Sequence, residues 1–157
     1  QAIRRLYQPV MNQVKNGAAL VIIDQADSWA QQLDNLYEHQ ALQYSGSERW
    51  GAQGRLFAGR SPFLDGLPEA QSMGWEYQVF YRGNVWGLDI NHAGNETIVA
   101  LAAQHRGNIL TAAARIPFGN GQIILSTLDL LPWLRSDRPQ AAAAKKLFLN
   151  FLEVSGK

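Results

Sequence analysis

The chain has 157 residues, a length that suits one domain, because single hydrophobic cores commonly serve about 100 to 200 residues. Hydrophobic residues make up 46% of the chain and charged residues 17%, so we expect a packed core rather than disorder. The formal net charge is +1 and the 14 basic residues are scattered, which argues against a nucleic-acid partner. The chain contains no cysteine, which excludes disulfides, thiolate metal sites and cysteine nucleophiles.

The two ends of the sequence and its hydropathy bear on context. No window approaches the roughly 18 to 20 apolar residues of a membrane span, so we expect none. The sequence opens at Gln1 without an initiator methionine and enters helix-like sequence at once, so we interpret it as a fragment of a larger chain. The missing cysteines leave the compartment open, and we favour a periplasmic or secreted location over a cytoplasmic one.

The first forty residues predict a helix, a buried strand and a second helix. The first helix carries an apolar stripe at a spacing of 4, 3 and 4, with Pro9 as a kink or a second start, and the stripe comprises Ile3, Tyr7, Val10 and Val14. Residues 18–23 are continuously apolar, which is typical of a central strand in a parallel sheet. The second helix follows a capping box of Ser28 and Gln31, and its apolar face comprises Trp29, Leu33, Leu36, Tyr37 and Ala41. This order indicates an α/β fold.

The rest of the chain predicts a turn-rich connection, several strands and a final helix. We expect residues 43–74 to form a structured connection within one domain. Strand-like runs follow at about 77–82, 85–90, 97–102, 109–116 and 122–127. The last two runs flank a glycine-bearing connection, 117–121, so an antiparallel pair should extend the sheet. The final helix starts near Asp137 and Pro139 and should pack on the sheet through Ala144, Phe148, Phe151 and Leu152.

Motifs for nucleophilic, phosphate and metal chemistry are missing. Ser126 follows a strand but lacks the G-x-S-x-G context that exposes a nucleophilic serine, so we favour a structural role. Gly119-Asn120-Gly121 opens a strand rather than a helix, which favours a hairpin over a phosphate cradle. The histidines are not paired at helical spacing, and they are His39, His92 and His105. We therefore expect neither a metal site nor a cofactor.

Carboxylates for glycosidic cleavage are present, but the sequence does not pair them. The reaction needs two carboxyl groups about 5 to 10 Å apart across a sugar site. The middle region supplies Asp65, Glu76, Asp89 and Glu96. Solvated or capping roles are the default for each of them, so we predict no catalytic residue in this chain.

The five tryptophans are the feature most open to a functional interpretation. An indole face can stack on a sugar ring, and its N–H group can donate a hydrogen bond. Trp29 lies on a helical apolar stripe and is expected in the core. For the others we favour core and interdomain packing, and the alternative is a carbohydrate contact formed by Trp50, Trp75 or Trp86 together with Glu76.

Several short motifs, taken in order, resemble a known module. They are Gly17-Ala-Ala-Leu-Val-Ile-Ile-Asp-Gln25, Ser61-Pro-Phe-Leu-Asp-Gly-Leu-Pro68, Trp75-Glu76-Tyr77, Ile116-Pro-Phe-Gly-Asn-Gly-Gln-Ile-Ile-Leu-Ser-Thr-Leu-Asp129 and the closing Ala-Lys-Lys-Leu helix. The pattern spans most of residues 8–155. It resembles the glutamine-amidotransferase-like, flavodoxin-like domain near the C-terminus of certain bacterial glycoside hydrolase family 2 proteins of the β-galactosidase type.

The resemblance implies a three-layer α/β sandwich, with a mostly parallel sheet extended by an antiparallel hairpin. The module usually begins with strands upstream of the first helix, so the sheet is expected to be incomplete at its N-terminal end. Class I amidotransferases rely on a cysteine that this chain lacks, and their chemistry does not transfer to it. In the hydrolases the catalytic glutamates reside on a (β/α)₈ barrel of about 250 residues, which this chain cannot contain.

The leading hypothesis is therefore a non-catalytic accessory domain of a glycoside hydrolase. Its partners would be the other domains of the parent, against which it would pack or help to shape the substrate entrance. One alternative is an independent carbohydrate-binding module that uses exposed tryptophans. A second alternative is a small stand-alone hydrolase with Asp24, Glu76, His92 or His105 as acid–base groups at the strand ends.

Overall fold

A computed structural model describes residues 2–37, 40–50, 54–81, 85–91, 94–103 and 107–155. The elements follow in the order α1 (Ala2–Lys15), β1 (Ala19–Ile22), α2 (Ala26–Tyr37), β2 (Gln43–Trp50), β3 (Gly54–Ala58), η1 (Pro62–Leu64), β4 (Gln71–Ser72), η2 (Trp75–Tyr81), β5 (Val85–Asn91), β6 (Glu96–Ala103), β7 (Ile109–Phe118), β8 (Gly121–Ser126), α3 (Leu131–Leu134), η3 (Pro139–Ala141) and α4 (Ala142–Ser155). Within these ranges no helix has the length and apolar character that a membrane crossing requires.

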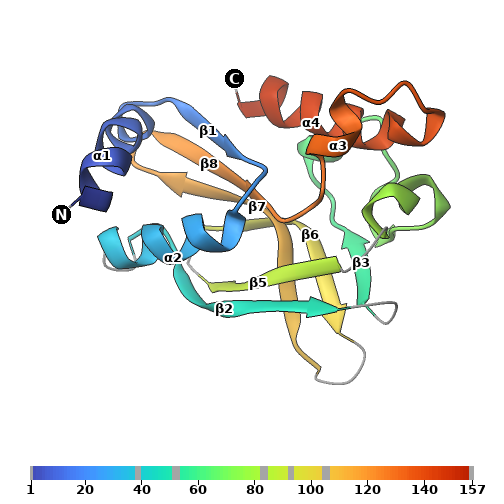
Figure 1. Cartoon of the computed structure of the whole chain (residues 1–157), viewed down its shortest axis with the longest axis horizontal. Coiled ribbons are helices and arrows are strands. Elements are labelled where there is room, and N and C mark those ends of the chain that lie inside the picture. The colour runs from blue at the N-terminus through green and yellow to red at the C-terminus, as the bar shows by residue number, and fades with distance from the viewer. Residues whose placement is uncertain are drawn as a thin grey trace.

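The strands form one mixed sheet, shown in Figure 1, whose main path runs β1-β8-β7-β6-β3-β4. A side branch leaves β7 through β5, which also pairs with β2. Among the described strands β1 and β8 form the parallel pair, and the other pairs are antiparallel. The prediction of a mostly parallel sheet is therefore wrong. The connections between β6, β7 and β8 are too short for the crossover of a dozen or more residues that a parallel pair needs.

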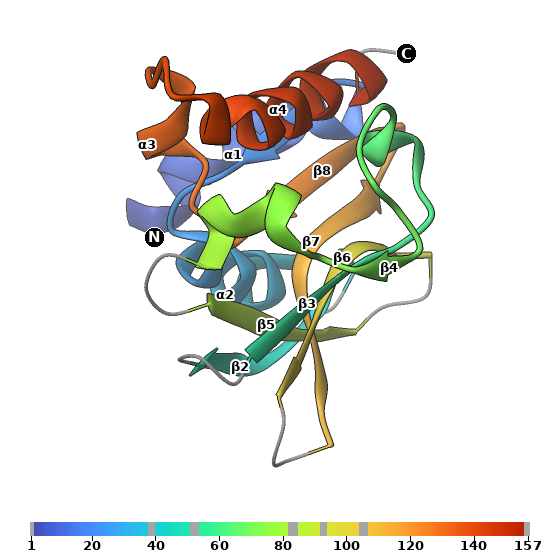
Figure 2. The same ribbon diagram turned by 90° about the vertical axis from the view of Figure 1, so that its right-hand side faces the viewer.

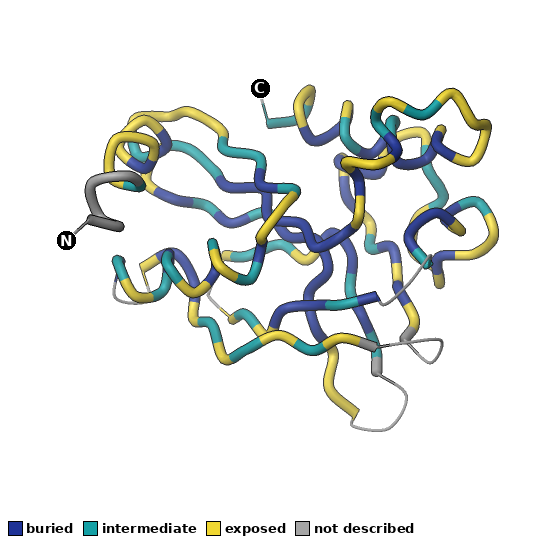
Figure 3. Tube along the Cα trace, in the orientation of Figure 1, coloured by how far each residue is buried: buried dark blue, intermediate teal, exposed yellow. Residues whose placement is uncertain are grey.

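Helices cover both faces of the sheet, so the expected α/β layering is confirmed. Alternate residues of β8 face opposite sides: Ile123 and Leu125 join the core with α1 and α2, whereas Ile124 joins the core with α4. The burial map in Figure 3 places the most continuous buried stretches in the centre of the sheet, along β7 and β8. Burying both faces of these strands provides the main hydrophobic stabilisation of the fold.

The predicted order of helix, strand and helix at the N-terminus is confirmed, with corrections to its details. α1 continues through Pro9 as one helix. Met11 is fully buried while Val10 is 37% exposed. The buried stripe therefore contains Met11 in place of the predicted Val10, whereas Val14 is buried as predicted. The apolar run predicts β1 in the centre of the sheet, but among the described strands β1 pairs with β8 alone, and Ala19 is exposed. An apolar run indicates burial, but only the tertiary structure decides which strands lie beside it.

Residues 43–74 contain more regular structure than the predicted connection. They form β2, β3 and the short β4, and β3 alternates as a strand should, with Leu56 and Ala58 buried and Arg55 and Phe57 exposed. The opposite error occurs at 77–82, where the expected strand is the 3₁₀ helix η2 up to Tyr81. A spacing of three buries Tyr77 and Phe80 together there.

The C-terminal part follows the predictions most closely. β7 and β8 form the expected hairpin, whose register closes on Phe118 opposite Gly121. A Cβ atom at Gly121 would clash with the carbonyl oxygen of Val14, so α1 packs against this strand at a distance that only glycine allows. α4 packs on the sheet as predicted, but Leu152 is 47% exposed, and the buried face includes Leu147 and Asn150 instead.

Candidate functional site

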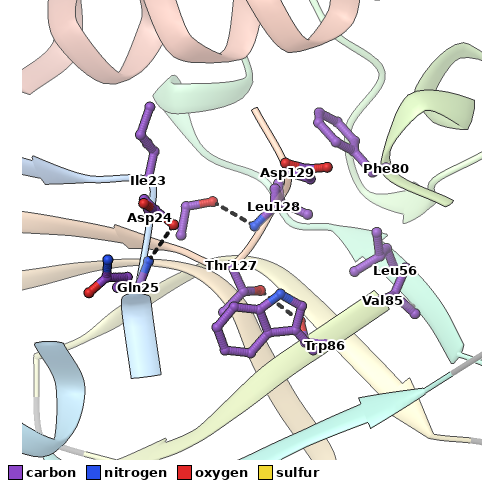
Figure 4. A pocket seen from close by; sticks show the side chains of 11 residues that line it. Ile23, Asp24, Gln25, Leu56, Phe80, Val85, Trp86, Thr127, Leu128 and Asp129 are labelled. Carbon is purple, nitrogen blue, oxygen red and sulfur yellow. Dashed lines mark hydrogen bonds between the residues drawn. The ribbon is translucent and has the colours of Figure 1, made fainter. Parts of the chain in front are cut away.

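A pocket of about 190 Å³ opens where β1 and β8 end (Figure 4). We call it the strand-end pocket; it is lined by residues 23–25, residues 126–129, and Leu56, Phe80, Val85 and Trp86. It lies at a fork in the sheet, because β7 pairs with β8 along Ala113–Phe118 and with β5 at Thr111. Open α/β sheets bind ligands at the carboxyl ends of parallel strands, and β1 and β8 form such a pair here.

The turn between β1 and α2 forms one wall of the strand-end pocket. Gln25 has a φ of +51°, a left-handed conformation that is uncommon outside glycine. The Oδ1 atom of Asp24 accepts a hydrogen bond from the backbone N–H of Gln25 (2.9 Å), and the carbonyl oxygen of Gln25 accepts one from Trp29 (3.1 Å). The turn is therefore held by its own side chain and by the first turn of α2.

The hydroxyl groups of the strand-end pocket are bonded to the backbone. The hydroxyl of Thr127 lies 2.6 Å from the carbonyl oxygen of Trp86 and 3.2 Å from that of Ala112, so it bridges the two branches of the fork. The Oγ of Ser126 accepts a hydrogen bond from the N–H of Leu128 (3.2 Å). A serine nucleophile needs an adjacent base, and the described residues that line this pocket include no histidine or lysine. The hydroxyls of Ser126 and Thr127 therefore help to hold the fork in shape.

Tyr81 strengthens the opposite wall. Its hydroxyl accepts a hydrogen bond from the N–H of Leu56 and donates one to the carbonyl oxygen of Met73, both at 3.1 Å. Burial raises the pKa of Tyr81, and the Leu56 hydrogen bond and the charge of Arg55 partly oppose this effect. The phenol therefore stays protonated near neutral pH and serves as a hydrogen-bonded strut.

The candidate residues fall into two separate places. Asp24 and Trp86 line the strand-end pocket, whereas Trp75 and Glu76 line a second pocket of about 500 Å³ between η2 and the start of α4. We call the second one the Trp75 pocket, and its other lining residues are Gly66, Leu67, Gln78, Pro139, Gln140, Ala142, Ala143 and Lys146. Trp50 ends β2 opposite Val85, but its side chain lies outside the described part of the structure. His39, His92 and His105 also lie outside the described residues.

The other candidate carboxylates, Asp65, Asp89 and Glu96, do not line one pocket together. Asp65 caps η1 and is exposed, Asp89 is exposed on β5, and Glu96 accepts a hydrogen bond from the hydroxyl of Ser61 (2.5 Å). Among the described residues there is no cluster of three or more His, Asp or Glu side chains that could hold a metal ion.

The other two tryptophans with described side chains take part in packing. Trp29 is half-buried and meets the ring of Tyr7 edge to face, with centroids 4.4 Å apart. Trp133 is 7% exposed and belongs to the core beside α4. Packing against the protein interior thus describes Trp29 and Trp133, but it does not describe Trp75, which is exposed.

Sequence reasoning missed several lining residues of both pockets. Asp129 follows the strand predicted at 122–127 just as Asp24 follows the one at 18–23, so the two would have been linked if the strands had been known to be neighbours. Gln140 and Lys146 lie more than sixty positions from Trp75, and no local pattern connects them.

Comparison with known proteins identifies the fold rather than a family. No protein-family model and no curated protein matches this chain. Among solved structures it is similar to the β-galactosidase from Bacillus circulans sp. alkalophilus, with a TM-score of 0.56 and 17% sequence identity. The match covers 94% of this chain and 20% of that protein, so the chain spans about a fifth of its length.

Proposed function

We propose that this chain is a non-catalytic accessory domain of a larger bacterial glycoside hydrolase of the β-galactosidase type. The observation that carries the proposal is the match of 94% of the chain to one fifth of a β-galactosidase structure. A catalytic (β/α)₈ barrel takes about 250 residues, so the acid and nucleophile of such an enzyme would lie outside this chain. As part of the same proposal, we infer that the domain is related to glutamine-amidotransferase-like modules.

The hydrogen bonding of the strand-end pocket supports a non-catalytic role. The hydroxyls of Ser126 and Thr127 are engaged with the backbone, and the pocket is formed at a fork that these bonds hold in shape. A serine hydrolase would instead need its nucleophilic hydroxyl beside a base.

An apolar strip on α4 supports contact with other domains. Leu149 and Leu152 lie three positions apart, so they share one helical face, and they are 50% and 47% exposed. Leu131, in the neighbouring α3, is 49% exposed. The proposed parent would bury this strip against its adjoining domain, where apolar area removed from water contributes to docking.

The reading frame around the codon for Gln1 provides the first test. We expect it to continue upstream and to encode a barrel with two suitably placed glutamates. A start codon immediately before Gln1 would contradict the proposal.

Activity measurements provide the second test. The purified 157-residue chain should not hydrolyse chromogenic β-galactosides, whereas the full polypeptide should. Deleting this domain from the parent should lower its thermal stability or its kcat/KM. Hydrolysis by the isolated chain that disappears in Glu76→Gln would instead identify a small hydrolase.

A further inference from the structure

The exposure of Trp75 is unusual among the tryptophans with described side chains. Trp75 is 82% exposed, whereas Trp133 is 7% exposed and Trp29 and Trp86 are half-buried. An indole that stays in water contributes little to the free energy of folding, because its apolar area is not removed from solvent. Large exposed aromatic side chains that line a pocket are typical of binding sites.

Hydrogen bonds tie down the segment that supplies Gly66 and Leu67 to the Trp75 pocket. Asn150 of α4 is 2% exposed, and its Nδ2 atom donates to the carbonyl oxygens of Phe63 (3.0 Å) and Asp65 (2.8 Å). These bonds fix the loop that leads to Gly66 and Leu67. The hydroxyl of the fully buried Tyr77 donates to the carbonyl oxygen of Pro68 (2.5 Å), which fixes η2 against the same loop. Figure 2 shows residues 75–81 beneath α3 and α4.

Polar side chains surround the indole at defined positions. Gln78 follows Trp75 by three residues, across a kink at Tyr77, and both side chains line the pocket. The carboxylate of Glu76 folds back so closely that a Cβ atom at Gly74 would lie 2.8 Å from its Oε2 atom. Across the pocket, Lys146 extends over Gly66, where an added Cβ atom would lie 3.0 Å from the lysine Cε atom.

The chemistry of these groups suits a neutral sugar. The lining includes one carboxylate, Glu76, and one ammonium group, Lys146, so neither sign of charge dominates. Together with the amides of Gln78 and Gln140 they offer donors and acceptors for hydroxyl groups. The indole provides a flat apolar surface for the C–H face of a pyranose ring. A volume of about 500 Å³ lies within the range of small-molecule pockets.

We propose that the Trp75 pocket binds a neutral pyranose unit of an oligosaccharide, with the ring stacked on the indole of Trp75 and its hydroxyls bonded to Gln78, Gln140 and Glu76. The choice of a galactoside as the first probe rests on the proposed function, but the site itself does not. Such a site would hold substrate chains near the catalytic domain of the parent and would raise their local concentration.

The direct test is calorimetric titration of the chain with β-1,4-galactotriose and with cellotriose as a second neutral hexose chain. We expect saturable binding that Trp75→Ala weakens roughly 5- to 100-fold, the range seen when an aromatic stacking platform is removed. Trp75→Phe should retain most of the affinity because a flat ring remains. Gln78→Ala or Gln140→Ala should weaken binding about 2- to 10-fold, the effect of losing one hydrogen bond.

A matched control removes exposed apolar surface elsewhere. Ile109 is 74% exposed at the start of β7, so Ile109→Ala should leave sugar binding unchanged. Circular dichroism of each variant reports whether it is folded.

Three outcomes would overturn the proposal. They are absence of binding of either trisaccharide by the folded chain, equal binding by Trp75→Ala, and shielding of Trp75 from acrylamide quenching in a longer parent polypeptide, which would identify an interdomain contact. If the chain binds no sugar at Trp75, the accessory-domain proposal still stands or falls by its own tests, which are the upstream reading frame and the deletion of the domain from the parent. Binding of cellotriose alone, lost in Trp75→Ala, would support the sugar site and contradict a galactoside-specific parent.

Discussion

The strand-end pocket and the Trp75 pocket both contain a tryptophan and at least one carboxylate, yet they expose the tryptophan differently. In the first, Trp86 is half-buried, and the hydroxyls of Ser126 and Thr127 bond to the backbone. In the second, Trp75 is 82% exposed, and hydrogen bonds from Tyr77 and Asn150 hold the loop on either side of Gly66 and Leu67. The two pockets therefore differ in how far their tryptophan and hydroxyl groups are available to a ligand.

Asn150→Ala should have the largest effect, because it removes the two hydrogen bonds that hold the loop leading to Gly66. It leaves the carbonyl oxygens of Phe63 and Asp65 without their side-chain donor. We expect the free energy of unfolding to fall by roughly 2 to 4 kcal/mol, measured by urea denaturation. The control Leu149→Ala changes a half-exposed neighbour and should cost less than about 1 kcal/mol. Equal losses in the two variants would show that Asn150 is not a support.

Thr127→Val should have the next largest effect and tests the strand-end pocket. The change keeps the shape of the side chain but removes the hydroxyl that reaches Trp86 and Ala112. We expect the free energy of unfolding to fall by about 1 to 2 kcal/mol in urea denaturation, because the carbonyl oxygen of Trp86 loses its hydroxyl donor. The carbonyl oxygen of Ala112 keeps the backbone N–H of residue 127. Thr97 is exposed on β6, and Thr97→Val should have little effect on unfolding. Unchanged stability of Thr127→Val would contradict the role assigned to the fork.

Tyr77→Phe should cost about 1 kcal/mol near neutral pH, because the hydrogen bond to Pro68 is lost. Burial, followed by the negative charges of Glu76 and Glu69, raises the pKa of Tyr77 to about 12. An unfolded tyrosine titrates near pH 10, so between about pH 10 and 12 the native state holds a proton that the unfolded state has lost. The stabilisation is complete below pH 10 and disappears as the pH rises towards 12.

The free energy of unfolding, measured by urea denaturation at several pH values above 9, should therefore fall less steeply with pH in Tyr77→Phe than in the unmodified chain. Tyr81, whose pKa is also raised, contributes to the slope of both proteins. Identical slopes would mean that Tyr77 does not remain protonated in the native state over this range.

Trp75→Ala should have the smallest effect on stability and so completes the comparison. Because 82% of the side chain is in water, the free energy of unfolding should change by less than about 0.5 kcal/mol. Thermal and urea denaturation measure this directly. A loss above about 1 kcal/mol would mean that the indole stabilises the fold and would weaken its assignment as a binding surface.

Local sequence patterns predicted the elements that they alone can specify. The order α1, β1 and α2 follows from a helical stripe and an apolar run, and the β7–β8 hairpin follows from two strand-like runs around a glycine-bearing turn. The prediction failed at η2, where the aromatic run of residues 77–81 is compatible with either a strand or a 3₁₀ helix. Contacts with η3 and α4, distant in sequence, decide between the two.

The amino-acid sequence by itself determined the α/β class, the absence of cysteine chemistry and the choice of Trp75, Trp86 and Glu76 as candidate contacts, because composition and periodicity are local properties. Only the tertiary structure decided that the sheet is mostly antiparallel, that β1 pairs with β8 and that Trp75 lines one pocket with Gln140 and Lys146. Strand pairing and solvent exposure depend on residues far apart in the chain, and no local pattern encodes them.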